Sequence, residues 1–411
     1  MRGRPQLYTS YAADQALLNT GTKRLSFALF GVVLLCLPLG FIPGFRWAAD
    51  ADWMLVLAEV AILFIAALGL NLLTGLAGQV SLGHAFFMGV GAYVAAILGS
   101  PEGPLWGLGL PIWVWLPAAG LVAAAIGVLI APTSFRVRGL YLAIVTLGLV
   151  FIGEHLFRNL DFITGGSQSG RTFPPLEFKF WKEETPFIDF ATDGDWFGVE
   201  LTGQAKTYYL MLGLALIAGL VAKNIQRTRA GRAFQSIRDR DIAAEITGVD
   251  EFRYKTIAFA LSSFFAGVAG ALFASFVGRT IPEAFGLPLS VEVIAIVLIG
   301  GAGVVSGMGM GAAFVIVMPL IVRTITEWLT QVAKTGEGVF QKIADVLVST
   351  GTFDPGLVSA SAGSGPGLNV FQLNQVLYGL LIVGFIIFEP LGLYGIWLRV
   401  RNYWKGWPFT Y

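Results

Sequence analysis

The chain has 411 residues, of which 55% are hydrophobic and 13% are charged, and its formal net charge is +1. A soluble globular domain carries about 25% charged residues, so this composition excludes an ordinary soluble protein and indicates a polytopic membrane protein. The single cysteine, Cys36, excludes a disulfide framework and a thiolate metal site. We expect no metal, no cofactor and no nucleic-acid partner.

Ten apolar segments follow one another along the chain, and most are close to the roughly 20 helical residues that a bilayer crossing needs. They cover residues 25–43, 53–73, 82–99, 112–131, 139–157, 207–222, 256–277, 290–301, 304–325 and 375–390. This pattern predicts an all-α fold with about ten transmembrane helices. The eighth segment is short and leads into IGGAGVVSGMGMG, so the eighth and ninth could instead form one broken hairpin. The first could be a signal peptide, but its length favours a retained span.

The distribution of Lys and Arg predicts the orientation of the chain, because cytoplasmic segments of membrane proteins carry an excess of both. With the N-terminus in the cytoplasm, 17 of the 27 basic residues fall in the inner segments 1–24, 132–139, 223–255 and 399–405. An even number of spans also returns the C-terminus to the same side. We therefore expect a cytoplasmic tail over 1–24, a transmembrane domain over 25–398 and a second cytoplasmic tail over 399–411.

Three connecting segments are longer than a simple turn, and they are 158–206, 223–255 and 327–373. In the predicted orientation the first and the third are outside and the second is cytoplasmic. The first is acidic and aromatic and could dock a partner protein. In the third, Phe340, Ile343 and Leu347 share one helical face, which predicts an interfacial helix before the flexible sequence SASAGSGPG. Solvated loops without a special role are the alternative.

Between the second and third spans, polar residues interrupt the apolar sequence GLNLLTGLAGQVSLGHAFFMGVGAY, which covers 69–93. They are Asn71, Thr74, Gln79, Ser81 and His84. Polar groups and irregular backbone at membrane depth persist only against protein or a water-filled cavity. We therefore predict that the cluster lines a translocation path or a gate. The alternative is that Ser81 and His84 only bond backbone carbonyls of neighbouring helices.

The basic stretch AKNIQRTRAGRAFQSIRDRDIAAEITGVDEFRYK, residues 222–255, is the second informative segment. Apolar residues recur in it at helical spacing, at Ala233, Phe234, Ile237, Ile242, Ala243 and Ile246. This pattern predicts short amphipathic helices below the membrane, with a stop at Gly248. Attraction to anionic lipid would explain the charges by itself. The small residues Ala243 and Ala244 also suit insertion into a groove on another protein.

Several motifs together resemble a known family. GLNLLTGLAGQVSLGHAFFMGVGAY, RGLYLAIVTLG, TGGSQSG, GRAFQSIRDRDIAAEITGVDEFRYK, AFALSSFFAGVAGALFA, VLIGGAG and LYGLLIVGFIIFEPLGLYG occur in this order. They look like the LivM-type permease subunit of ABC importers for branched-chain and other hydrophobic amino acids. The resemblance covers most of 50–325 and 375–395. It implies a multi-pass protein of the bacterial inner membrane that forms half of a translocation path.

The resemblance also implies partners and a coupling loop. The partners would be a homologous LivH-type permease, two ABC ATPase subunits, a periplasmic or lipid-anchored substrate-binding protein and a small amino-acid substrate. The coupling-loop residues would be Gly231, Arg232, Ile237, Arg238, Ala243, Ala244 and Gly248. Ile242 stands where the importers' EAA motif has Glu, and the later Leu-Pro is missing. The resemblance therefore implies docking on the ATPase but does not fix the contacts that this loop makes there.

Other functions remain possible at this stage. The chain has no Gly-x4-Gly-Lys-Ser/Thr sequence, so we expect that it is not an enzyme and that partner subunits hydrolyse ATP. A urea or amide importer permease is an alternative. An ion-coupled transporter could use Glu59, Glu292, His84 and His155. A hydrolase could pair Ser262 or Ser306 with a histidine, but Gly303, Gly307 and Gly311 around Ser306 better indicate tight helix packing.

Overall fold

The structure is a computed structural model that describes residues 21–39, 51–101, 105–137, 139–180, 186–196, 199–335, 348–349, 358–359, 368–389 and 391–406. The interfacial helix expected at Phe340, Ile343 and Leu347 lies outside these residues.

Helices dominate the described chain, and each of the ten predicted spans coincides with one of them. The long helices are α2 (Gly21–Cys36), α3 (Ala51–Leu70), α4 (His84–Gly99), α5 (Ile112–Arg136), α6 (Leu140–Asn159), α9 (Gly203–Arg227), α12 (Glu251–Val277), α13 (Leu287–Gly300), α14 (Val305–Thr335), α16 (Val370–Phe388) and α17 (Gly392–Gly406). Among the described residues, seven helical stretches are long and apolar enough to cross a membrane, and Arg24–Cys36 and His84–Gly99 are shorter apolar helices. The predicted all-α membrane fold is confirmed.

Short elements lie at the two ends of the bundle. They are η1 (Asn71–Leu76), α7 (Asp161–Thr164), α8 (Gly166–Ser169), β1 (Arg171–Thr172), β2 (Glu177–Phe178), β3 (Ile188–Asp189), β4 (Gly194–Trp196), β5 (Val199–Leu201), α10 (Arg229–Asp239), α11 (Asp241–Ile246), β6 (Arg279–Thr280), η2 (Pro282–Phe285), β7 (Val348–Ser349), β8 (Val358–Ser359) and β9 (Leu368–Asn369). The antiparallel pairs are β1–β6, β2–β3 and β4–β5, and β7, β8 and β9 form a parallel sheet.

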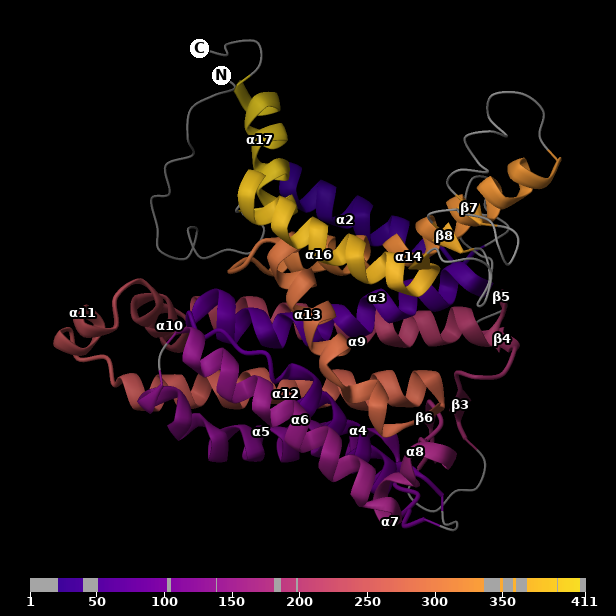
Figure 1. The fold of residues 1–411 in the computed structure, drawn as a ribbon, viewed down its shortest axis with the longest axis horizontal. Helices are drawn as coiled ribbons and strands as arrows, with labels where there is room; N and C mark the ends of the chain where they lie inside the picture. The colour runs from indigo at the N-terminus through magenta and orange to yellow at the C-terminus, as the bar shows by residue number, and fades with distance from the viewer. Residues whose placement is uncertain are drawn as a thin grey trace.

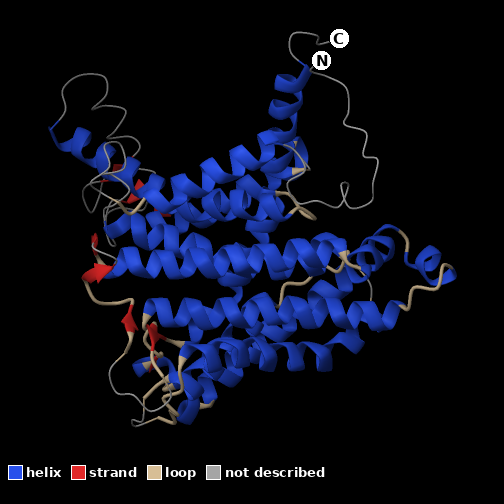
Figure 2. Ribbon diagram, turned by 180° about the vertical axis from the view of Figure 1, so that it is seen from behind, coloured by secondary structure: helices blue, strands red, loops and turns tan. Residues whose placement is uncertain are grey.

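The long helices of the central layers run side by side, with α10 and α11 projecting at one end (Figure 1). The α7 and α8 helices and strands β3 to β6 lie at the opposite end, and the view from behind shows the strands confined to that side of the molecule (Figure 2). The described parts of 223–255 and 158–206, which the sequence predicts on opposite sides of the membrane, are therefore separated along the helix axes.

Helix α12 is the centre of the packing, because it contacts α3, α4 and α5. Glycines bring α4 and α12 together: a Cβ on Gly91 would lie 2.1 Å from the carbonyl oxygen of Gly267, and a Cβ on Gly270 would lie 2.0 Å from that of Met88. Lipid supplies no hydrophobic drive between helices, so such close approach is how membrane helices gain packing energy. This interface fixes α4, the helix that follows the polar cluster.

Candidate coupling and gating site

The polar cluster between the second and third spans lies where α3 loses its regular form. Helix α3 continues into η1, which is π-helical, and the chain then runs through 77–83 before α4 begins at His84. Wide π-helical turns often mark functional positions in otherwise regular helices. Four of the cluster's side chains are buried and one is half-buried, and the five are Asn71, Thr74, Gln79, Ser81 and His84.

Three of these side chains bond backbone groups of their own segment or of the preceding helix. His84 Nε2 lies 2.8 Å from the Ala66 carbonyl oxygen. The Thr74 hydroxyl donates to the Gln79 carbonyl oxygen at 3.0 Å, and Ser81 Oγ accepts from the Gly83 amide at 3.3 Å. These bonds stabilise the interruption of the helix.

Asn71 connects η1 to the turn between α13 and α14. Its Oδ1 accepts a 2.6 Å hydrogen bond from the amide of Gly303, and the Gly303 carbonyl accepts one at 3.2 Å from Gln226 Nε2 of α9. Gly303 has a φ of +90°, a conformation that favours glycine. Of the predicted packing glycines, Gly307 and Gly311 lie where α14 closely approaches α13, whereas Gly303 lies in this turn.

Helix α10 packs against η1, the π-helical segment that follows α3. The Thr228 hydroxyl caps it by accepting from the Gly231 amide at 3.5 Å, and its buried face comprises Gly231, Ala233, Phe234 and Ile237. At its last turn, Arg238 Nη1 donates to the Gly75 carbonyl at 2.8 Å. Gly78, with a φ of +70°, lies against the aliphatic part of Arg238. We call Asn71, Gly75, Gln226, Arg238 and Gly303 the coupling joint.

Helix α11 extends α10 and presents a different surface. Ala244 is buried, whereas Ile242 and Ile246 are 66% and 82% exposed. Ala243 is also exposed, and Gly248 ends the segment with a φ of +86° and open space around it. Beyond the coupling joint, α11 therefore presents exposed apolar side chains to the surroundings. Arg232 lies on the exposed side of α10 and donates to the Arg227 carbonyl at 3.1 Å.

An open cavity of about 540 Å³ lies beside the coupling joint, between the turn 77–79, the start of α6 and the two helices α10 and α11. Gln79 lines it, and neither the nitrogen nor the oxygen of its side-chain amide has a hydrogen-bond partner in the described chain. The structure thus brings together three sets of residues that the sequence left separate: the polar cluster, the coupling loop and the glycine-rich turn.

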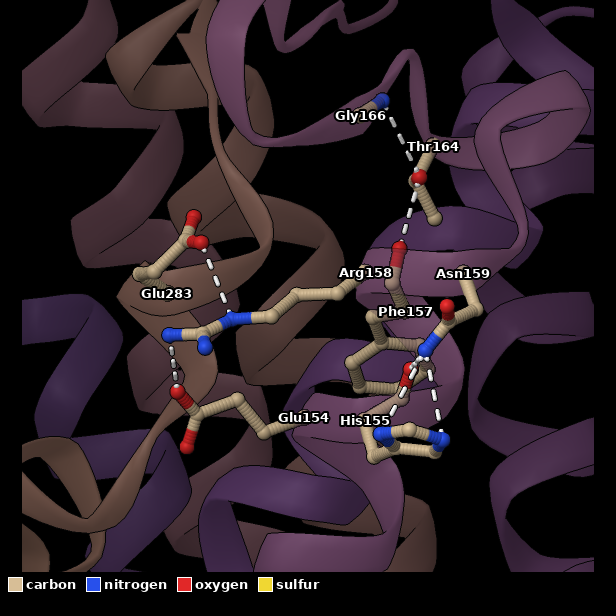
Figure 3. Close-up of polar contacts among 8 residues, drawn as sticks. All are labelled: Glu154, His155, Phe157, Arg158, Asn159, Thr164, Gly166 and Glu283. Atoms are coloured by element: carbon tan, nitrogen blue, oxygen red, sulfur yellow. Dashed lines mark hydrogen bonds and ion pairs between the residues drawn. The ribbon is translucent and has the colours of Figure 1, made fainter.

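At the opposite end, His155, one of the residues considered for ion coupling, and its neighbour Glu154 make local contacts (Figure 3), whereas Glu59 and Glu292 lie in α3 and α13. Arg158 bonds Glu154 of its own helix at 2.6 Å and Glu283 of η2 at 3.0 Å, and His155 lies 3.3 Å from the amide nitrogen of Asn159. His84 bonds Ala66 of α3 and His155 bonds Asn159 of its own helix, so the two histidines have different partners. No serine hydroxyl in the described chain is hydrogen-bonded to either histidine.

Two polar residues that organise the structure were not singled out from the sequence. Gln226 belongs to the coupling joint. In the sequence it could have been noticed only as a single glutamine in the last turn of a long apolar helix. Arg171, 2% exposed, donates to the carbonyls of Ala96, at 2.9 Å, Ile163 and Trp106. Burial lowers the pKa of its guanidinium from the usual value for arginine, and Tyr93 offsets part of this effect. We call this set of contacts the Arg171 clamp.

Comparison with known proteins gives a consistent family. A family described as branched-chain amino acid transport system / permease component matches residues 53–349. The chain is 36% identical over 275 residues to the high-affinity branched-chain amino acid transport system permease protein LivM of Salmonella typhimurium and to that of Escherichia coli. The match covers 65% of this chain and 63% of the length of each relative.

A second kind of relative matches a shorter part. The autoinducer 2 import system permease protein LsrC of Escherichia coli is 33% identical over 140 residues, which cover 32% of this chain and 38% of that protein. No solved structure matches the chain.

Proposed function

Because the chain belongs to the family of permease components of branched-chain amino acid transport systems, we propose that it is a permease subunit of an ATP-driven importer of hydrophobic amino acids. It would form half of a translocation path with a homologous permease. Two ABC ATPase subunits would supply the energy, and a periplasmic or lipid-anchored binding protein would deliver the substrate. The chain would lie in a bacterial inner membrane with both termini in the cytoplasm.

One contact carries the mechanistic part of this proposal: the hydrogen bond from Arg238 of α10 to the Gly75 carbonyl of η1. It joins the helix nearest the proposed motor to the broken helix of the proposed path. Asn71 and Gly303 extend the connection to the α13–α14 turn. A displacement of α10 would therefore reach two membrane-spanning segments at once.

In this mechanism α11 docks on the ATPase. Ile242 and Ile246 supply exposed apolar surface for a groove, and burial of such surface drives helix-in-groove binding. Ile242 replaces the Glu of the EAA motif, so the contact would depend more on apolar burial than on an ion pair. Closure of the ATPase dimer would move α10 and α11 together and open η1 and its neighbours to the other side of the membrane.

Affinity purification of the tagged chain from native membranes in a mild detergent tests the assembly. Mass spectrometry of the co-purified chains is expected to find an ATPase with Walker motifs and a second permease. Reconstituted into vesicles with the binding protein, the complex is expected to import labelled leucine only with ATP. Recovery of this chain alone in several mild detergents, with uptake driven by an ion gradient, would contradict the proposal.

The substitution Ala243→Arg tests the docking role of α11. Ala243 is exposed, so the folded permease should tolerate arginine, while a bulky charge in the docking surface should abolish ATP-driven uptake. Asn224→Arg, which adds the same charge at an exposed position of α9, is the matched control and should retain uptake. Normal uptake by Ala243→Arg would refute the docking assignment.

A further inference from the structure

The open cavity beside the coupling joint has a size and a position that suit a small ligand. Its volume of about 540 Å³ lies within the range of small-molecule sites, about 300–1,000 Å³. Its walls come from α6, from the turn 77–79 and from α10 and α11. Leu142 and Ile237 give it buried apolar surface on two of these sides.

Two polar groups of the cavity wall have unused hydrogen-bonding capacity. The Gln79 side chain is buried, yet its Nε2 and Oε1 have no partner in the described chain, which is unfavourable for a buried amide. The Arg240 guanidinium likewise makes no hydrogen bond or ion pair with a described residue. The other cations at the cavity are engaged, Lys255 with Glu251 and Arg238 with the Gly75 carbonyl.

The charges around the cavity favour a ligand with a negative group. Three basic residues line it against two acidic ones, and these five are Arg238, Arg240, Lys255, Asp239 and Asp241. The Arg240 guanidinium offers paired N–H donors to a carboxylate, and the Gln79 amide can both donate and accept. Asp239 and Asp241 can accept hydrogen bonds from an ammonium group, while the apolar walls suit a hydrocarbon side chain.

We propose that this cavity binds a free amino acid with an apolar side chain on the cytoplasmic side, and that its occupation slows further import. This inference rests on the proposed function, which makes the ligand the product of transport and the α10 end cytoplasmic. The cavity is then a site, at the cytoplasmic end of the predicted path, at which accumulated product acts on the transporter.

The position of the cavity gives the reason for inhibition. One wall is α6, and another is the pair of helices that the ATPase would move. A ligand that contacts both walls binds best in the arrangement in which the cavity is open, so it shifts the population toward that arrangement. Each transport cycle would then have to displace the ligand or wait for its release.

The test uses the complete transporter, reconstituted into vesicles that contain ATP either alone or with unlabelled leucine. Lumenal leucine is expected to lower the initial rate of labelled leucine uptake, and leucinamide, which lacks the carboxylate, is expected not to. Arg240→Gln should raise the lumenal leucine concentration for half-inhibition about tenfold, since a charge-assisted hydrogen bond is lost. Its uptake without lumenal leucine should stay within about twofold of the original, as for most exposed substitutions.

Arg229→Gln is the matched control, because it removes the same charge from the first residue of α10, which does not line the cavity. This variant should be inhibited like the unaltered protein. No inhibition by lumenal leucine, or an equal shift in both variants, would overturn the inference while leaving import established. Absence of ATP-driven leucine uptake by the unaltered complex in vesicles without lumenal leucine would instead overturn the proposed function.

Discussion

The coupling joint and the Arg171 clamp both hold separate segments together through an arginine that donates to backbone carbonyls, but they differ in burial. Arg171 is 2% exposed and bonds three carbonyls from three segments. The side chain of Arg238 is 42% exposed and reaches one carbonyl, that of Gly75, and the neighbouring Asp239. A buried polar contact is costly to break, whereas a half-exposed one exchanges with water. The clamp thus suits a fixed anchor and the joint a movable link.

The surroundings of the two arginines strengthen this contrast. Near the clamp, the ring of Tyr93 lies 5.0 Å from that of Phe157, 6.0 Å from that of Phe173 and 5.9 Å from that of Phe285. Such aromatic packing buries a large area and resists separation. The joint instead contains glycines, which let backbone segments touch but add little side-chain packing. Movement is therefore easier at the α10 end.

The largest effect is expected from Arg171→Met, which leaves three carbonyls of the clamp without a buried donor. The loss of stability should reach about 3 kcal/mol or more, since each unsatisfied buried group costs about 1–3 kcal/mol. Thermal unfolding of the purified protein, followed by tryptophan fluorescence, measures it. Arg279→Met is the control, because Arg279 lies on the paired strand but is exposed, and within the described chain its side chain bonds only the Ser169 carbonyl. Equal destabilisation by both variants would remove the contrast between anchor and link.

Arg238→Met should separate function from stability at the coupling joint. The half-exposed side chain can be replaced with little change in thermal unfolding, while loss of the charge-assisted bond to Gly75 should slow ATP-driven uptake about tenfold to hundredfold. Arg229→Met, at the start of the same helix, should leave uptake unchanged. A large fall in unfolding temperature without a specific loss of uptake would make Arg238 a structural residue like Arg171.

The local features of the molecule were predictable from the sequence, and the contacts between distant segments were not. In the described chain, apolar runs predicted the long helices except α17, and the glycines and polar residues of 69–93 predicted the interruption of α3. The contacts that define the joint and the clamp connect Gln226 to Gly303, 77 residues away, and Arg171 to Ala96, 75 residues away. Hydrophobic periodicity reports which face of a helix is buried, but it carries no information about which carbonyl a side chain will reach.

A smaller effect on stability is expected from Asn71→Leu. This change removes the acceptor for the Gly303 amide but also removes the Asn71 Nδ2 donor, which has no partner in the described chain. The two changes oppose each other, so we expect a loss of about 1 kcal/mol in thermal unfolding. Thr74→Val, which removes only a local bond, should cost less. A loss as large as that of Arg171→Met would show that the joint is as rigid as the clamp.

The smallest effect is expected at the ion pairs of Arg158, which lie at the same end as the clamp but are partly exposed. Arg158→Gln removes a guanidinium that bridges Glu154 of α6 and Glu283 of η2, and exposed pairs of this kind contribute about 0–1 kcal/mol. The unfolding temperature should therefore fall only slightly, and high salt should reduce the difference between the variant and the original protein, because salt screens exposed charges. Arg158→Gln could instead lower the unfolding temperature as much as Arg171→Met, and the decrease could persist in high salt. Burial of Arg171 would then not explain why the clamp is more stable than the coupling joint. The rigidity of that end would then come from ion pairing across η2.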